Sequence, residues 1–256
     1  MLKAGQFSIA KQLEAELHTT GRRNATSSAI LPLVTVTLLE VISVIISVIL
    51  INWAIVPIYP QSRWPLIPPV LLILTLIIYS QVKRGESWRD LGFSQRYFLT
   101  ASRFLFLPVT LGCVVLLAIG YINNSIHRST HFGTNLLIIP FWGVMQQYVL
   151  QGFLYRRIVF LSFHVPSHHV TQPQQVWLAI FFTAGLFSAV HLPNFPLALL
   201  ALIAAIVWAW VYERAPNLWA LGLSHGLLSL VLMHSLPLQF LHSMSVGYKH
   251  FLYQKF

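Results

Sequence analysis

The chain has 256 residues, of which 56% are apolar and only 9% are charged, and its net charge is +10. A soluble domain carries roughly a quarter charged residues on its surface, so this composition excludes a water-soluble globular protein. Its Lys and Arg residues lie between apolar runs and not on one solvated face, which argues against a nucleic-acid binder. The composition therefore predicts an integral membrane protein.

Seven apolar runs approach the roughly 20 residues that a helix needs to cross a bilayer. We therefore predict an all-α, polytopic transmembrane helix bundle of seven to eight spans. A polar N-terminal arm at 1–28 precedes a membrane-embedded domain at 29–237, and 238–256 form an interfacial or weakly spanning tail. The predicted spans are residues 30–56, 64–81, 97–122, 134–155, 175–192, 195–212 and 216–236.

The basic residues are unevenly divided between the two sides of these spans. Cytoplasmic segments of membrane proteins carry an excess of Lys and Arg, so the richer side predicts a cytoplasmic N-terminus, in a plasma (inner) membrane. That side holds Lys3, Lys11, Arg22, Arg23, Lys83, Arg84, Arg89, Arg96, Arg103, Arg156, Arg157 and Arg214, against Arg63, Arg128, Lys249 and Lys255 on the other.

Three glutamines mark the fourth predicted span. At about 100° per residue, Gln146, Gln147 and Gln151 fall within one arc, and the last two are i,i+4 neighbours. Polar side chains in hydrocarbon are costly, so these amides are expected to face the bundle. They predict either a functional site or simple hydrogen bonds between helices.

Two histidines on other spans strengthen the first interpretation. His191 lies at the end of the fifth span, after Phe187 and before Asn194, and His225 lies within the seventh span, ahead of Ser229. A lone histidine in an apolar helix is usually structural. Two of them beside a glutamine face favour a site, because imidazole can hold water or accept a proton.

These residues resemble the motifs of the CPBP family, the intramembrane proteases that include the CAAX prenyl endopeptidase and bacteriocin-immunity proteins. That family carries Glu-Glu-x-x-x-Arg, then Phe-x-x-x-His, then His-x-x-x-Asn. Here the first motif aligns with Gln146-Gln147-x-x-x-Gln151, the second with Phe187 to His191, and the third with His225 and Ser229. The loop element Leu91-Gly92-Phe93 extends the resemblance to residues 87–230.

The resemblance implies a helical membrane endopeptidase that acts on a membrane-associated peptide. Gln146, Gln147, His191 and His225 then occupy the catalytic positions, with Gln151, Phe187, Asn194 and Ser229 in support. Glutamine has the shape of glutamate but cannot accept a proton, and loss of a general base costs about 10²- to 10⁴-fold in rate. The alternatives are an impaired protease, a pseudoprotease that binds peptide without cutting it, and a bundle whose amides only join helices.

Other charged residues could replace the general base or the arginine of the first motif. Glu40, deep in the first predicted span, is a candidate compensating acid, because intramembrane carboxylates are functional candidates by default. Arg156 and Arg157 lie too far along the fourth span to replace the motif arginine.

Two further patterns predict other chemistries. Gly222 to Gly226 matches the G-x-S-x-G nucleophile pattern, which requires a strand–turn–helix setting; a rhomboid-like pairing of Ser224 with His234 leaves the glutamines unexplained. Two histidines with neutral amides do not favour zinc, so we expect no metal and no cofactor. His164, His168 and His169 are expected to be solvated.

Overall fold

The computed structural model describes residues 27–59, 62, 64–127, 132–164, 171–237 and 239–253, and all regular structure in these ranges is helical. Two of the helices contain π-helical segments, η1 and η3. The elements are α2 (Ser27–Leu50), η1 (Ile51–Ile55), α3 (Val56–Ile58), the 3₁₀ turn η2 (Trp64–Leu66), α4 (Ile67–Lys83), α5 (Phe98–Ile122), α6 (Phe132–Gln147), η3 (Tyr148–Tyr155), α7 (Arg156–His164), α8 (Gln172–Ala189), α9 (Phe195–Arg214), α10 (Leu218–Ser235), the 3₁₀ turn η4 (His242–Met244) and α11 (Tyr248–Tyr253).

Each of the seven predicted spans coincides with one long helical run of the described chain, which confirms the all-helical fold class. Five runs are long and apolar enough to cross a membrane: Pro32–Ile58, Trp64–Lys83, Phe98–Ile122, Phe195–Arg214 and Leu218–Ser235. The other two, α8 and the continuous run α6–η3–α7, contain most of the glutamines in the bundle. The chain is therefore an integral membrane protein whose two most polar long helices are packed among apolar ones.

The predicted N-terminal arm lies outside the described residues except for its last two positions. In the tail, α11 has six residues, a rise of about 9 Å, so it is far shorter than the hydrocarbon core of about 30 Å. Hydrogen bonds tie the tail to the turn after α8: the Gly247 amide donates to the Leu192 carbonyl at 2.9 Å. Asn194 Nδ2 donates to the carbonyls of Leu241 and Ser245 at 2.6 and 3.2 Å.

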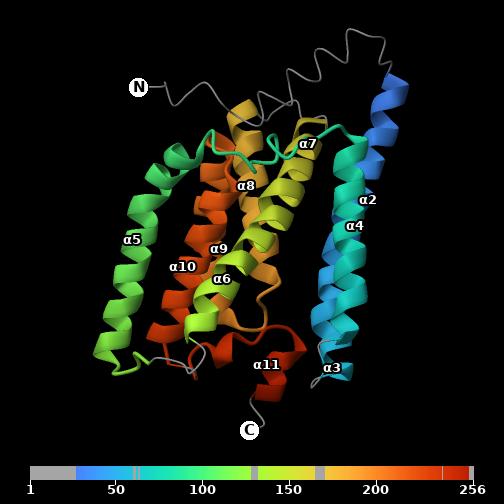
Figure 1. Cartoon of the computed structure of the whole chain (residues 1–256). Helices are drawn as coiled ribbons and strands as arrows, with labels where there is room; N and C mark the ends of the chain where they lie inside the picture. The colour runs from blue at the N-terminus through green and yellow to red at the C-terminus, as the bar shows by residue number, and fades with distance from the viewer. Residues whose placement is uncertain are drawn as a thin grey trace.

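The helices form a bundle in which α2 and α4 stand together on one side and α5 stands at the opposite edge (Figure 1). Between them, the run α6–η3–α7 crosses the bundle at an incline beside α8, α9 and α10. The α2 helix contacts both α4 and α7. We call the end at which α4 and α9 terminate the basic end, because Arg84, Arg157 and Arg214 lie there.

Glycines bring α6 and α10 into close backbone contact. A Cβ on Gly222 would lie 2.4–2.7 Å from atoms of Val144, and one on Gly226 would lie 2.5 Å from the Cα of Pro140. On the facing helix, a Cβ on Gly143 would lie 2.5 Å from the carbonyl oxygen of Gly222. Small residues spaced four apart allow such close approach of membrane helices, and the result places the middle of α10 against the end of α6.

The start of α10 is held by the loop that contains Leu91-Gly92-Phe93. Gly92 has a φ of +96°, which favours glycine, and its carbonyl accepts a hydrogen bond from the Leu218 amide at 3.0 Å. The Tyr212 hydroxyl donates to the Leu91 carbonyl at 2.8 Å. The loop therefore joins the end of α9 to the beginning of α10 at the basic end.

Substitution of Gly222 by alanine should destabilise the bundle, because the added methyl overlaps Val144. Overpacking costs about 1–3 kcal/mol, and thermal unfolding of the purified protein in detergent should show a lower Tm. Gly185→Ala is the matched control, since its Cβ meets nothing within 4 Å and alanine favours helix over glycine. An equal or higher Tm for Gly222→Ala would contradict the close helix contact.

Candidate functional site

The α6–α10 contact brings a glutamine and a histidine of the predicted site together. The Nε2 atom of Gln147 lies 3.3 Å from Nδ1 of His225. Gln147 is fully buried and His225 is 8% exposed. The two residues meet because the glycines on each side of His225 let α10 approach the end of α6.

His191 reaches the same region from the turn after α8. Its ring packs edge-on against the Phe187 ring at 4.7 Å between centroids, and Phe187 also contacts the His225 ring at 5.8 Å and the Trp208 ring at 6.2 Å. Phe187 therefore separates and positions the two imidazoles. On the far side, the indole of Trp208 stacks on His225 at 4.4 Å and donates from Nε1 to Ser224 Oγ at 3.1 Å.

The hydrogen bonds give the two neutral histidines opposite tautomers. The Nδ1 atom of His191 lies 2.6 Å from the Phe187 carbonyl oxygen, which only accepts, so the proton is on Nδ1 and Nε2 keeps its lone pair. With the Gln147 amide oriented as in the structure, its NH₂ group donates to Nδ1 of His225, so this imidazole carries its proton on Nε2. The pair thus offers one acceptor, Nε2 of His191, and one donor, Nε2–H of His225.

The remaining predicted site residues divide into two groups. Gln151 is fully buried one turn after Gln147, whereas Gln146 and Ser229 are only partly buried. Within the described residues, neither of the last two is hydrogen bonded to His191 or His225. Asn194 caps α9 by accepting from the Leu197 amide at 3.3 Å and uses its NH₂ group to hold the tail, so its role here is structural.

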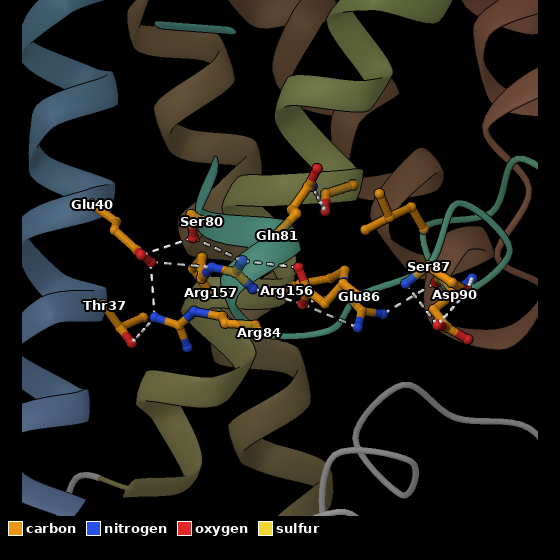
Figure 2. Close-up of polar contacts among 12 residues, drawn as sticks. Thr37, Glu40, Ser80, Gln81, Arg84, Glu86, Ser87, Asp90, Arg156 and Arg157 are labelled. Atoms are coloured by element: carbon orange, nitrogen blue, oxygen red, sulfur yellow. Dashed lines mark hydrogen bonds and ion pairs between the residues drawn. The ribbon is translucent and has the colours of Figure 1, made fainter. Parts of the chain in front are cut away.

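Glu40 belongs to a different cluster, at the basic end (Figure 2). Its carboxylate lies 2.8 Å from Arg84 Nη2 and 3.2 Å from Arg157 Nε, and it accepts a hydrogen bond from Ser80 Oγ at 2.7 Å. Arg84 also donates to Thr37 Oγ1 at 2.7 Å. The Glu40 carboxylate is therefore paired with residues of the basic end, and its role as a compensating acid stays a prediction.

Glu86 completes this cluster from the loop after α4. Its two carboxylate oxygens accept from Arg157 at 2.7 and 2.9 Å, and Arg156 Nε and Nη2 both donate to Oε1 at 3.3 Å. Arg156 also donates to the Asp90 carbonyl at 3.2 Å. The sequence pattern did not predict this ionic cluster (Glu40, Arg84, Glu86, Arg156 and Arg157), although the paired arginines at the end of an apolar run were a visible signal.

Electrostatics within the ionic cluster determine how Glu86 titrates. Burial alone would raise its pKa, but the hydrogen bond and charge of Arg157, together with Arg156, outweigh burial and lower the pKa below its usual value. Glu86 is therefore ionised at neutral pH. For Arg84, burial and the neighbouring Arg157 charge lower the pKa, partly offset by Glu40 and Glu86.

The π-helical segment η3 connects the site to the ionic cluster. A π turn shifts backbone hydrogen bonds from i+4 to i+5, and such segments are frequent at functional sites. Gln81 on α4 donates from Nε2 to the Gly152 carbonyl at 3.2 Å and accepts from the Tyr148 hydroxyl at 2.6 Å. Gln81 is buried and was not singled out from the sequence, because its partner is 71 positions away.

The structure also excludes the two serine-protease patterns, the G-x-S-x-G elbow and the Ser224–His234 pair. Residues 222–226 lie inside α10, so the strand–turn–helix setting of a nucleophile elbow is not present. Ser224 donates to the Leu221 carbonyl at 2.7 Å, whereas His234, ten residues and about 15 Å farther along the helix, bonds to the His127 carbonyl. These two residues do not form a catalytic pair.

The described residues contain no group of three or more His, Cys, Asp or Glu side chains that could hold a metal ion. His164 is hydrogen bonded to the Phe160 carbonyl at 2.7 Å and stacks on the Phe160 ring. The predicted neighbours His168 and His169 lie outside the described residues.

The ionic cluster predicts a loss of stability in acid. A lowered folded-state pKa means that Glu86 contributes fully above the ordinary glutamate pKa of about 4.3 and loses its contribution as pH falls through the folded value. Thermal unfolding from pH 7 to pH 3 should show this fall in Tm. The Glu86→Gln variant should start lower at pH 7, since removal of one partner from a buried pair costs about 3–5 kcal/mol, and should change less with pH. Parallel curves for both proteins would contradict this assignment.

Comparison with known proteins matches residues 128–231 to the family model for type II CAAX prenyl endopeptidase Rce1-like proteins. Searches of curated proteins and of solved structures found no match. The matched segment contains α6, η3, α7, α8, α9 and most of α10, and with them Gln147, His191 and His225. This match confirms the resemblance drawn from the three sequence motifs: residues 128–231 of this membrane protein are similar to the Rce1-like domain, which is consistent with the CPBP family.

Proposed function

We propose that this chain is a CPBP-type pseudoprotease, which binds a membrane-associated peptide at the protease site without hydrolysing it efficiently. The observation that carries the proposal is the hydrogen bond from the Gln147 amide to Nδ1 of His225. A glutamate at this position would accept from Nδ1–H and leave Nε2 free as a base. The glutamine instead occupies the Nδ1 lone pair and leaves a proton on Nε2, so this imidazole has no free lone pair for a proton from water.

No other acid among the described residues supplies the missing base. Glu40 and Glu86 are paired with arginines in the ionic cluster. Asp90 accepts from the Ser87 hydroxyl, and Glu213 accepts from the Tyr155 hydroxyl at 2.8 Å. Each carboxylate is therefore held by partners outside the His191–His225 pair.

The same two histidines suit peptide binding. A peptide group offers one N–H donor and one C=O acceptor, and His191 and His225 offer one acceptor and one donor at Nε2. Because Phe187 and Trp208 surround these rings, a hydrogen bond to either is formed in a low-dielectric setting, where it is stronger than in water. We propose that the ligand is an extended segment of a membrane-bound peptide or protein.

A second candidate function is slow endopeptidase activity. The specific observation in its favour is the Nε2 lone pair of His191, which is left free by the bond from Nδ1 to the Phe187 carbonyl. In that mechanism His191 takes a proton from water and Gln147 contributes no proton transfer. The expected rate is about 10²- to 10⁴-fold below that of an enzyme with a carboxylate base.

Restoration of the carboxylate separates these two functions. Purified protein in bilayer nanodiscs would be given a panel of membrane peptides, with binding measured by photocrosslinking and cleavage by mass spectrometry. We expect the parent to crosslink without cleavage, and Gln147→Glu to cleave, alone or with Gln146→Glu. Parent cleavage that His191→Ala abolishes would establish the slow enzyme instead.

The control for this experiment is Gln146→Leu, because Gln146 is partly buried and makes no hydrogen bond to either histidine among the described residues. It should bind peptide like the parent, whereas His225→Ala should reduce crosslinking in the fraction of the variant that remains folded. If His191→Ala and His225→Ala both leave crosslinking unaltered, the peptide-binding site is not where we propose.

We further propose that the basic end faces the cytoplasm of a plasma membrane, with the N-terminal arm on that side. The support is the position of Lys83, Arg89 and Arg103 at one end of the bundle, as the positive-inside rule requires. In a Cys113→Ser background, an Arg89→Cys variant should react with an impermeant maleimide in inverted vesicles only. Reaction in right-side-out vesicles would reverse the topology.

A further inference from the structure

Three polar side chains in the middle of the bundle are fully buried and carry polar atoms without a protein partner among the described residues. Gln147, Gln151 and Thr183 are each 0% exposed. Within the described residues, Oε1 of Gln147, both amide atoms of Gln151 and Oγ1 of Thr183 have no hydrogen-bond partner. Buried polar groups in native proteins are nearly always hydrogen bonded, because leaving them unpaired removes a substantial part of the stability of a domain.

The three side chains belong to adjoining helix faces. Gln147 and Gln151 are four residues apart at the start of η3, which contacts α8. Thr183 lies four residues before Phe187 on α8, and Phe187 touches the His225 ring that Gln147 binds. The α8 helix runs antiparallel to η3, so Thr183 lies on the same side of the histidines as Gln151. Both residues are one turn nearer to the basic end than the histidines are. We call these three residues the buried polar group.

The hydroxyl of Thr183 has no hydrogen-bond partner within its own helix, α8. A threonine inside a helix ordinarily donates to the carbonyl four residues earlier, as Thr37 does to Leu33 at 2.7 Å. Thr183 does not make this bond although it is equally buried. The Thr183 hydroxyl is therefore available to form a hydrogen bond with a bound molecule.

We propose that the buried polar group binds a cluster of water molecules between η3 and α8. Buried water typically makes about three hydrogen bonds to otherwise unsatisfied polar groups, and this group offers acceptors at both glutamine oxygens, donors at Gln151 Nε2, and a hydroxyl that does either. Water fits better than a peptide because all three side chains are completely enclosed. The inference does not depend on peptide binding at His191 and His225.

The position of the water gives Gln147 a second contact. Its Nε2 atom binds His225 while Oε1 accepts from the water cluster, so the glutamine links the histidine to internal water. The chain therefore keeps hydrolytic water within reach of the site but has a neutral amide where a base would act.

X-ray radiolytic labelling tests the water cluster directly, because hydroxyl radicals formed from bound water modify the nearest side chains irrespective of their exposure. In the full-length protein in detergent, we expect Phe187 to be labelled many-fold faster than Phe153, a fully buried ring that packs on Arg157. Thr183→Val and Gln151→Leu should each reduce labelling of Phe187 several-fold. Thr110→Val, at an exposed position of α5, is the matched control and should leave it unchanged.

Two results would overturn the proposal. Labelling of Phe187 no faster than that of Phe153 in the parent protein would show that the buried polar group is dry, and this comparison requires no variant to fold. Labelling of Phe187 that persists unchanged in a folded Gln151→Leu variant would place the water elsewhere. Neither result depends on whether the peptide crosslinks, so this inference and the proposed function fail separately.

Discussion

The contact between α6 and α10 is the interaction on which the site depends. Two glycines four residues apart, Gly222 and Gly226, let the backbones approach, and His225 lies between them on the same helix. A larger side chain at either position would separate the helices and carry His225 away from Gln147. In a bilayer, where hydrophobic burial does not drive helices together, such packing contacts must supply the association.

The ionic cluster acts at the other end of the same helical run. Arg156 and Arg157 begin α7, which continues η3, and their partners come from α2, α4 and the following loop (Figure 2). The cluster thus ties the α2–α4 pair to the helix that carries the glutamines. Buried charges are tolerated here because each has several partners.

Between these two ends, polar side chains recur from the end of α6 along η3. Gln147 and Gln151 are followed at the same spacing by Tyr155, whose hydroxyl donates to Glu213. The π-helical geometry of this segment leaves the Gly152 carbonyl to be satisfied by Gln81 from α4. Polar side chains from α4, η3 and α9 are therefore hydrogen bonded in the interior, which accounts for part of the polarity of the run α6–η3–α7.

The sequence predicted the helices and placed its candidate site residues on helices that pack together. Seven long apolar runs sufficed for the fold class, because each backbone polar group in lipid must be satisfied within its own helix. Motif order brought Gln147, Phe187, His191 and His225 into one hypothesis, and all four lie together. Motif order did not show which of Gln146 and Gln147 bonds to His225. The two residues are adjacent on one helix, and only the packing of the other helices decides which of them faces His225.

Residue types by themselves determined that this protein lies in a membrane and that the glutamines of its candidate site are neutral, since no pattern of folding can turn an amide into a base. Tertiary structure decided the roles of individual polar residues. Glu40 is paired with Arg84 and Arg157, and Asn194 holds the tail through its hydrogen bond to the Leu241 carbonyl. Such pairings join residues tens of positions apart, and only the packing of helices specifies them.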